Sequence, residues 1–487
     1  MLRLRVGNLH TRVVDPEAGT RRWLAGFLTF ENDSRAFLAR KYGNRDAAAG
    51  VDRLYNWAYD TFPTGLLAYV IAEAKANGIP VEHDDADARL VPGYVIDTAD
   101  VAWLRDYQRD AVDAVLRDKR GILHLPTGAG KTEVFCALAR KLWCNHLFIV
   151  HRTTLVHNAV ERLRKRAPEI AVGTVAEGAW DIPEDARVVC ATFQTLAKAL
   201  KTNDARALNL LNEWTHALHI DECHTLPADT FYNVAMSTPN AYWRVGYSGT
   251  PLARGDKRST LAVAALGGVI HRVRPEQLIA AGVLAKPRIR VVPVTQTSDA
   301  LTWQGVYSEC VMRSATRNAA VVDCVRKAEK PCLVFVSQID HGEALQQRLA
   351  KANISAEFVS GAESVEQRAA AVRRLERGDA DVLIASVVFQ EGVDIPTLAS
   401  VVMAAGGKST IAAIQKVGRA LRVAPGKTEA EVWEFDDRGH RLLERHTKAR
   451  LRAYAAEGYP TTIEGNAATA SRKVRKATGP CDKGRRP

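Results

Sequence analysis

Short apolar runs alternate with longer segments of helical period along most of this chain. Between residues 122 and 437, the stretches that favour buried strands are ILHLP, ALHID, PCLVFV, ISAEFV, DVLIAS, ASVVM and EVWEF. Helix-like segments lie between them, such as EVFCALARKLW after residue 132. Strands that alternate with helices are typical of parallel sheets covered by helices. The pattern therefore predicts an α/β protein with two tandem parallel-sheet lobes, at 103–295 and 310–460.

The ends of the chain differ from this middle region. In residues 1–100, LRLRV and WLAGFLTFEN favour strands, RAFLARKY and PTGLLAYVIAEAKANGIP favour helices, and VEHDD favours a strand. We expect a small α+β accessory domain. Residues 437–459 predict a basic helix with an apolar side, whose charges either meet phosphate or face solvent. Residues 471–487 lack apolar periodicity and predict a disordered basic tail.

Composition adds limits to this picture. The length of 487 residues suggests two to four domains, and 47% apolar residues are ordinary for a globular protein. Apolar runs such as 261–270 are too short to span a bilayer, and the N-terminus has no signal-peptide pattern. We expect a protein of the cytoplasm of a bacterial or phage-infected cell, without membrane contact. The eight cysteines form no CxxC pair, so buried free thiols are expected rather than zinc sites or disulfides.

The net charge of +12 is unevenly distributed and favours polyanionic partners. Half of the excess lies in the tail, where seven basic residues stand against one acid, Asp482. Residues 1–100 contain 12 basic and 14 acidic residues, so no basic surface is predicted overall. Five arginines cluster early, opposite the acidic stretch HDDADA, and leave open a polarised domain with one basic strand face: Arg3, Arg5, Arg12, Arg21 and Arg22.

Residues 122–132, ILHLPTGAGKT, have the pattern of a phosphate-binding loop between a strand and a helix. Gly128 and Gly130 let backbone N–H groups surround an anion at the helix N-terminus. Lys131 would reach the β- and γ-phosphates, and Thr132 would ligate Mg²⁺. Leu125 stands where the usual pattern has its first glycine. The loop residues expected around the nucleotide are Thr127, Gly128, Ala129, Gly130, Lys131 and Thr132.

About ninety residues later, HIDECHTLPADTF (219–231) ends a strand in two adjacent acids. Taken alone, the stretch fits a metal site, a cysteine nucleophile or carboxylates acting on phosphate. Because parallel strands deliver their ends to one sheet edge, Asp221 and Glu222 should meet the phosphate loop. Asp221 would then hold Mg²⁺ with Thr132, and Glu222 would deprotonate the attacking water. Cys223 and His224 lack the partners that zinc or nucleophilic chemistry requires.

Two stretches in the second half carry further candidate chemistry. QEGVDIP (390–396) places Gly392 and Asp394 after a buried strand. QKVGRALR (415–422) places Gln415, Arg419 and Arg422 along one helix, with the two arginines three residues apart on a shared face. This suits two guanidinium groups directed at one γ-phosphate. An ordinary solvated basic helix is the alternative.

These stretches together resemble the ordered motifs of superfamily 2 helicases. LRDYQRDAV resembles the Q-motif, LPTGAGKT motif I, FIVHRTTLVHNAVERL motif Ia, DECH motif II, GYSGTPLARGD motif III, VLIASVVFQEGVDIP motif V and QKVGRALR motif VI. VVCATFQTL resembles a further nucleic-acid-contacting motif. The resemblance implies two RecA-like lobes that bind Mg·ATP, with Gln108 reading adenine and with Gly392, Asp394, Gln415, Arg419 and Arg422 completing the site. It also implies nucleic-acid contacts at Arg152, Thr153, Thr154, Thr192 and Gln194.

Within this superfamily, the stretch GGVIHRVRPEQLIAAGVLAKPRIRV and the later SATRNAAVV resemble phage UvsW-type and XPB-like DNA helicases. SGTP in motif III and Gln415 in motif VI differ from DEAD-box RNA helicases. The resemblance implies a monomeric motor on duplex or branched DNA, with branch migration in replication, recombination or repair. For residues 1–100 it implies an accessory DNA-engaging domain, and a cap that stabilises the first lobe is the alternative. An RNA helicase, a duplex translocase that never separates strands and a DNA-binding scaffold with an inactive ATPase site remain alternatives.

Overall fold

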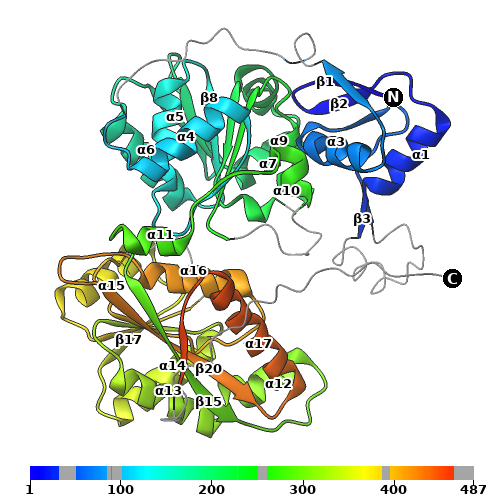
Figure 1. Cartoon of the computed structure of the whole chain (residues 1–487). Coiled ribbons are helices and arrows are strands. Elements are labelled where there is room, and N and C mark those ends of the chain that lie inside the picture. Colours follow the sequence, from blue (N-terminus) through cyan, green and yellow to red (C-terminus); the bar gives the residue numbers. More distant parts are fainter. Residues whose placement is uncertain are drawn as a thin grey trace, which may run out of the picture. The chain divides into compact units, whose positions relative to one another are not determined.

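The computed structural model describes residues 1–31, 51–84, 89, 101–226, 229–250, 260–386 and 395–464 (Figure 1). The chain divides into two compact units. Unit 1 comprises residues 1–285, 389–396 and 411–428, and unit 2 comprises 286–388, 397–410 and 429–487. Residues 286–295, which the sequence pattern assigned to the first lobe, form a strand in the sheet of unit 2. The division therefore differs there from a simple cut between two consecutive lobes.

Unit 1 contains an eight-stranded sheet in the order β10-β9-β11-β8-β12-β13-β7-β14. Its neighbouring strands run parallel, except for the antiparallel pair β10 and β9. The strands are β7 (Arg120–His124), β8 (His146–Val150), β9 (Val172–Ala176), β10 (Ala179–Asp181), β11 (Val188–Thr192), β12 (Ala217–Ile220), β13 (Trp243–Ser248) and β14 (Val269–Arg272). The helices are α4 (Asp106–Asp118), α5 (Lys131–Lys141), α6 (Thr153–Arg166), α7 (Phe193–Lys201), α8 (Ala205–Leu208), α9 (Asp229–Met236), α10 (Thr260–Leu266) and α11 (Pro275–Ala280).

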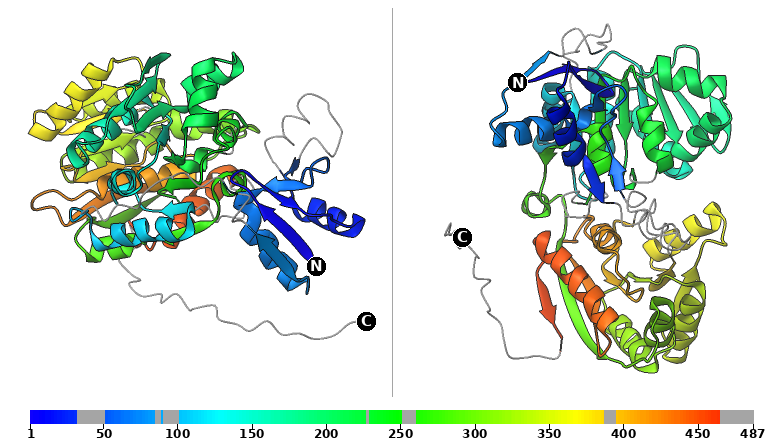
Figure 2. Two further views of the ribbon diagram at one scale, coloured as in Figure 1. Left: turned by 90° about the horizontal axis from the view of Figure 1, so that it is seen from above. Right: turned by 90° about the vertical axis from the view of Figure 1, so that its right-hand side faces the viewer.

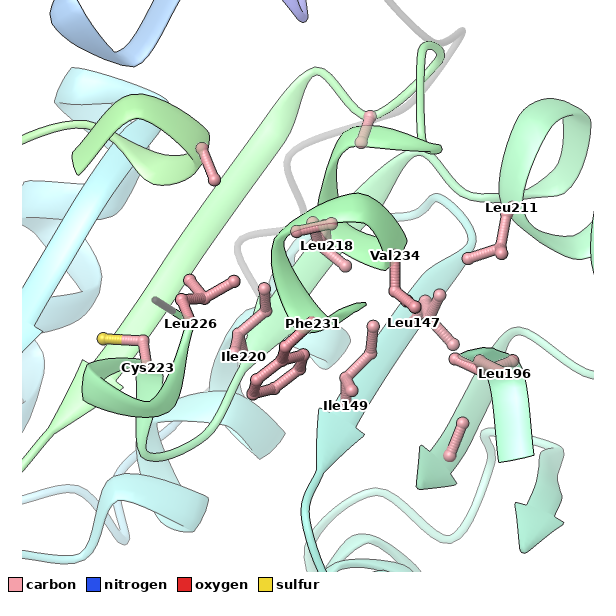
Figure 3. Close-up of a cluster of buried hydrophobic side chains, with 14 of the residues drawn as sticks. Leu147, Ile149, Leu196, Leu211, Leu218, Ile220, Cys223, Leu226, Phe231 and Val234 are labelled. Atoms are coloured by element: carbon pink, nitrogen blue, oxygen red, sulfur yellow. The ribbon is translucent and has the colours of Figure 1, made fainter. Parts of the chain in front are cut away.

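The apolar strands predicted from the sequence form the core of this sheet. Leu147 and Ile149 on β8 and Leu218 and Ile220 on β12 alternate toward one face, where Phe231 of α9 covers them (Figure 3). Burial on both faces is what continuous apolar runs require of parallel strands. The ends of β7, β8, β11 and β12 thereby lie at one edge of the sheet.

Unit 2 has a seven-stranded sheet, β17-β18-β16-β19-β20-β15-β21, in which neighbouring strands are parallel. Its strands are β15 (Lys286–Thr295), β16 (Cys332–Phe335), β17 (Ala356–Val359), β18 (Val382–Ala385), β19 (Ser400–Val402), β20 (Glu429–Arg438) and β21 (Thr461–Ile463). Its helices are α12 (Trp303–Tyr307), α13 (Ala315–Lys327), α14 (Ile339–Lys351), α15 (Val365–Arg377) and α17 (Arg441–Ala456). The two parallel, helix-covered sheets confirm the predicted α/β class with tandem RecA-like lobes.

The predicted basic helix at 437–459 is α17, which packs on β20 (Figure 2). Its expected charged residues Arg441, Arg445, Lys448 and Arg452 are exposed. Arg450, which has no phosphate role in the prediction, is instead buried and donates from Nη2 to Glu434 Oε1 at 3.0 Å. One side of the helix is therefore held to the sheet by a buried ion pair as well as by apolar contacts.

The described residues between 1 and 84 form an α+β domain that belongs to unit 1. A four-stranded sheet, β5-β2-β1-β6, is built from β1 (Leu2–Val6), β2 (His10–Val13), β5 (Thr61–Pro63) and β6 (Val81–Asp84). Helices α1 (Ala18–Phe27) and α3 (Leu67–Ala76) and the short hairpin of β3 (Thr29–Glu31) and β4 (Val51–Arg53) complete it. Residues 23–27 were predicted to be a strand and this was wrong. They end α1, because Leu24 and Leu28 recur with helical spacing and are both buried.

This domain is docked on α10. Its apolar cluster includes Val263 and Ala264 of α10, and Figure 1 shows α3 beside that helix. Gly65 makes the closest approach, since a Cβ there would lie 2.0 Å from the carbonyl oxygen of Val263. The domain and the sheet of unit 1 therefore share one packed interface.

Two expectations from composition concern the cysteines and membrane-spanning segments. Seven of the eight cysteines lie among them, and these seven are buried and free. Within the described ranges, no helix combines the length and apolarity needed to cross a bilayer. The predicted tail at 471–487 and helix at 35–42 lie outside the described residues.

Candidate active site

The phosphate-binding loop follows β7 and ends at α5, as the sequence pattern predicts. Gly128 and Gly130 have φ angles of 86° and 79°, in the left-handed region that favours glycine. Gly130 directly precedes Lys131, the first residue of α5, so the loop ends at the N-terminus of this helix. This is the arrangement in which a helix terminus binds phosphate.

Lys131, Asp221 and Glu222 converge at this loop although 91 residues separate the lysine from Glu222. β13 lies between β7 and β12, so the two strands end at the same sheet edge without being neighbours. Nζ of Lys131 lies 2.5 Å from Glu222 Oε1 and 4.0 Å from Asp221 Oδ1. Glu222 adopts φ 47°, a left-handed conformation uncommon outside glycine. This turn directs the second acid of the pair back toward the loop.

Burial and charge act in opposite directions on these three groups. Burial would lower the pKa of Lys131, but Glu222 and Asp221 outweigh it and raise that pKa. Burial would raise the pKa of Glu222, but Lys131 and His224 outweigh it and lower that pKa. For Asp221, burial dominates over Lys131 and raises the pKa. Glu222 is thus the ionised partner of Lys131. At Asp221, in contrast, nearby positive charge does not offset the effect of burial on the carboxylate.

Asp221 also has the chemistry that a hard cation requires. Its Oδ1 atom is buried and has no hydrogen-bond partner among the described residues. Carboxylate and hydroxyl oxygens together with phosphate oxygens and water are typical Mg²⁺ ligands. Asp221 therefore fits the role of an Mg²⁺ ligand in a nucleotide complex.

Cys223 and His224 take places consistent with their exclusion as zinc or nucleophile residues. Cys223 is fully buried and burial raises the pKa of its thiol. It packs against Gly246 of β13, where a Cβ would lie 2.9 Å from its Sγ atom. His224 Nδ1 lies 3.2 Å from Glu222 Oε2. In the described ranges, no group of three or more histidine, cysteine or acidic side chains could hold a metal.

Gln108 lies under the phosphate loop with both ends of its amide occupied. Its Nε2 donates to Ala129 O at 2.9 Å, and its Oε1 accepts from Arg105 N at 2.9 Å. Tyr107 donates from its hydroxyl to the same Ala129 oxygen at 3.0 Å. Tyr107 adjoins Gln108 in the sequence but was not among the predicted site residues. Adenine recognition by Gln108 stays a prediction, because in this arrangement its amide supports the loop.

Helix α16 (Thr410–Ala420) carries Arg419 and also meets the loop, because its residues from 411 onward belong to unit 1. The prediction that Arg422 lies on the same helix was wrong, because α16 ends at Ala420. A Cβ at Gly418 would lie 2.8 Å from Thr127 Cβ, so only glycine allows this approach. Arg422 forms a backbone bridge with Leu284, and its Cγ lies 3.9 Å from where a Gly128 Cβ would be. The segment 411–428 thus places Arg422 beside the phosphate loop.

Four further residues were predicted to complete this site: Gln415, Arg419, Gly392 and Asp394. Gln415 lies on α16 and is half-buried. The backbone of Arg419 is part of α16, but its side chain lies outside the described residues, as do Gly392 and Asp394 entirely. Gly249 of the SGTP stretch also lies close to Thr127 of the loop, a contact that was not predicted from the sequence. A Cβ there would lie 3.2 Å from Thr127 Oγ1, so this glycine also lets chain approach the loop.

The predicted nucleic-acid residues gather at the same sheet edge, beyond the acids. β8 and β11 are adjacent parallel strands, and each is followed at once by a helix, α6 or α7. Arg152 precedes α6, and Thr153 and Thr154 begin it. Gln194 donates from Nε2 to His151 O at 2.8 Å and links the two strand ends. Thr192 is buried, and its hydroxyl pairs with that of Thr195 at 2.9 Å, so it supports the turn from within.

A chain of buried hydrogen bonds crosses the sheet beneath the acids. His146 Nε2 lies 2.9 Å from Leu142 O, its Nδ1 lies 3.0 Å from His219 Nε2, and His219 Nδ1 lies 3.0 Å from the Tyr247 hydroxyl. Because the Leu142 carbonyl can only accept, His146 donates to it, His219 donates to His146, and Tyr247 donates to His219. Burial lowers the pKa of His146 to about 4 and holds the pKa of His219 well below its usual range. Both rings are therefore neutral and tie β8, β12 and β13 together.

Comparison with known proteins identifies two helicase domains in this chain. Residues 102–253 match the family described as type III restriction enzyme, res subunit, and residues 316–424 match the helicase conserved C-terminal domain. The ATP-dependent DNA helicase UvsW of phage T4 is 28% identical over 88% of this chain and 89% of its own length. The helicase-family protein IRC3 of Saccharomyces cerevisiae is 26% identical over 68% of this chain, which spans about half (51%) of that protein. The DNA-bound structure of the ATP-dependent restriction-modification enzyme LlaBIII superposes with a TM-score of 0.55 over 80% of this chain and 32% of its own, at 17% identity, a likeness of fold.

Proposed function

We infer that this chain, which belongs to the superfamily 2 helicases, is an ATP-dependent DNA helicase or translocase. The observation that carries this inference is the convergence of Lys131, Asp221 and Glu222 at a glycine-containing loop on a helix N-terminus. A cation, a cation-binding acid and an ionised acid beside loop amides suit hydrolysis of a nucleoside triphosphate. The similarity to UvsW supports ATP as the nucleotide and DNA as the track.

In the proposed cycle, Lys131 and the loop amides bind the β- and γ-phosphates. Thr132 and Asp221 would hold Mg²⁺, which neutralises phosphate charge. For Lys131 to reach phosphate, its contact with Glu222 must break. The positive charge that lowers the pKa of Glu222 then moves away, so Glu222 becomes a stronger base as the nucleotide is bound. Glu222 is then suited to take a proton from the attacking water.

Coupling to movement would run through the segment 411–428. It packs against the phosphate loop within unit 1, yet it is continuous in the chain with β19 and β20 of unit 2. We propose that Arg422 and Arg419 contact the γ-phosphate and that their engagement links the nucleotide state to unit 2. Gln415, Gly392 and Asp394 would complete the same site.

The DNA backbone would bind at the N-termini of α6 and α7. Neighbouring helix N-termini offer unsatisfied backbone N–H groups to phosphates. Arg152, Thr153, Thr154 and Gln194 lie at these ends, with Thr192 supporting them from below. Contacts of this kind are independent of base sequence, as a motor that moves along DNA requires.

The test is the steady-state ATPase rate with single-stranded DNA, blunt duplex, a four-way junction and RNA of matched length, with Lys131→Ala as the blank. We propose that duplex or branched DNA stimulates turnover most, as for a branch-migration enzyme. Stimulation by RNA alone would keep the motor and refute the DNA substrate. Turnover equal to the Lys131→Ala blank with every ligand would indicate a DNA-binding scaffold. A strand-displacement assay then separates an unwinding helicase from a translocase. Activity as a monomer and in the cytoplasm stay predictions.

A further inference from the structure

A turn in the N-terminal domain presents two aromatic rings to solvent. Residues 56–60, NWAYD, connect β4 to β5, and a bridge between Asn56 and Thr61 closes the turn. The side chains of Trp57 and Tyr59 are 52% and 69% exposed. Aromatic residues usually bury most of their surface, and exposed ones that are held in place suggest an interaction surface. We refer to residues 55–60 as the aromatic turn.

The aromatic turn is held by a network of hydrogen bonds in which Tyr55 is buried and the side chains of Asp60 and Arg21 are 15% and 39% exposed. Arg21 donates from Nε and Nη2 to the two carboxylate oxygens of Asp60 at 2.8 and 2.7 Å, and the Tyr55 hydroxyl donates to the same group at 2.8 Å. Tyr55 is buried and meets Trp57 edge to face, with ring centroids 5.9 Å apart. Rings fixed in this way lose little conformational entropy when a partner binds. The network also leaves Asp60 neutralised by Arg21.

A sheet face that carries paired arginines adjoins the turn. On β1 and β2 every second residue is exposed, and Arg5 and Arg12 are directly opposite each other on that exposed face. Like charges opposite one another in a sheet are unfavourable unless an anion lies between them. Arg12 is also paired with Thr61, the residue that closes the turn. On the other side of β1, Asp84 is directly opposite Arg5 and Glu82 is opposite Arg3. The positive charge beside the exposed rings is therefore that of Arg12, with Arg5 between it and the acids of β6.

We propose that the aromatic turn and the Arg5–Arg12 pair bind an unpaired strand of the DNA substrate. Bases would stack on Trp57 and Tyr59, and phosphates would lie at the two arginines. Duplex DNA keeps the faces of its bases in its own stack, so exposed rings select bases that are unpaired. Arginines beside the rings add backbone contacts that are independent of sequence.

This inference rests on the proposed DNA motor function and gives the N-terminal domain a place in it. Because Gly65 and the shared apolar cluster fix the domain on α10, a strand held at the turn is held in a set position relative to the sheet of unit 1. Movement of duplex along unit 1 would then draw an unpaired strand across the turn. The domain thus contacts the strand-separated part of a forked or branched substrate.

The test uses the full chain and fluorescein-labelled DNA of three kinds at one salt concentration: a single strand, a blunt duplex and a forked duplex. Anisotropy titrations give the Kd of each. We expect Trp57→Ala/Tyr59→Ala to weaken binding of the single strand and the fork by about 10- to 100-fold, with the blunt duplex within twofold. Tyr69→Ala, which removes a 53% exposed tyrosine from α3, should change none of the three affinities. Trp57→Phe/Tyr59→Phe should restore most of the lost affinity, because phenylalanine still stacks.

Two further measurements make the assignment specific. Arg5→Gln/Arg12→Gln should reduce the slope of log K against log salt for the single strand by about 1.4, from two phosphate contacts. A 2-aminopurine base in the single strand should be quenched by the wild-type protein and not by the variant lacking both rings. Unchanged single-strand and fork affinity in that variant would overturn the inference and assign the turn to a protein partner. An equal loss for blunt duplex would overturn its selectivity for unpaired bases. A wild-type chain that binds no DNA would instead refute the proposed function itself.

Discussion

Glutamine at position 222 separates the two effects that Glu222 has on the site. The substitution keeps the size of the side chain and removes its charge. In the structure Lys131 Nζ donates to Glu222 Oε1 at 2.5 Å. This is the same ammonium group that we assign to the β- and γ-phosphates of the nucleotide. Nucleotide can use this cation only after the contact is broken. Glu222→Gln should therefore favour ATP binding while it removes the base that hydrolysis requires.

The size of the first effect follows from the burial of the pair. The side chains of Lys131 and Glu222 are 14% and 16% exposed, so solvent screens their contact only weakly. A charge-assisted hydrogen bond of this kind contributes about 1.5–3 kcal/mol. Part of that free energy is recovered by the neutral amide, which still accepts from Lys131. A remaining difference of about 1.4 kcal/mol corresponds to tenfold tighter binding of ATP. Turnover should fall by about 10²- to 10⁴-fold, as for loss of a positioned general base.

Calorimetric titration with Mg·ATP and phosphate release under saturating DNA measure the two effects on one preparation. Asp221→Asn is the matched control, because it leaves the contact between Lys131 and Glu222 in place and removes the proposed Mg²⁺ ligand. We expect it to bind ATP more weakly, in a Mg²⁺-dependent way. If Glu222→Gln turned over ATP within tenfold of wild type, Glu222 would not be the base. ATP binding weaker than wild type in that variant would refute the competition for Lys131.

Arg422→Ala should lower turnover at least 10³-fold with ATP affinity nearly unchanged, and near-normal phosphate release would contradict its role as a finger. The pKa of His146 is about 4 in the fold against 6.5 in the unfolded chain, so only the unfolded state gains a proton as pH falls between these values. The contribution of His146 to stability should be constant above pH 7 and fall by about 3 kcal/mol toward pH 4. In urea unfolding, the stability of His146→Gln should therefore fall less over this range than that of the wild type. Gly65→Val should lower the thermal midpoint by about 2–10 °C through its clash with Val263, whereas Gly19→Val, with no heavy atom within 4 Å, should not. Deleting 471–487 should reduce the salt dependence of DNA binding, and an unchanged slope would make this tail passive.

The aromatic turn bears on the two interpretations that the sequence left open for the first hundred residues. Packing on α10 fits a stabilising cap, and the exposed face with Arg5 and Arg12 fits a DNA-engaging domain. The structure lets one domain do both, since the buried face and the charged face are opposite sides of the same sheet. The Gly65 and Trp57/Tyr59 variants separate these contributions, because one acts on the buried interface and the other on the exposed turn.

What the sequence determined by itself was local. The apolar runs, the glycines of the phosphate loop and the acids after a buried strand each depend on neighbouring residues, so their periodicity and order identified both lobes. Periodicity was ambiguous in the short apolar run 23–27, WLAGF, which is compatible with a strand or a helix. It joined a helix because Leu24 and Leu28 share a common core. The meeting of the loop with the acids followed from one general rule, that parallel strands end at the same edge.

The tertiary structure decided which partner each polar group has. Lys131 meets Glu222, Gln108 supports Ala129, and the backbone of 411–428 reaches the loop through Gly418. These contacts join residues 21 to nearly 300 positions apart, and they depend on strand order, with β13 inserted between β7 and β12. Local pattern does not specify strand order, because every parallel strand with an apolar run buries equally well at any inner position. Packing of the whole sheet selects one order, and with it the site.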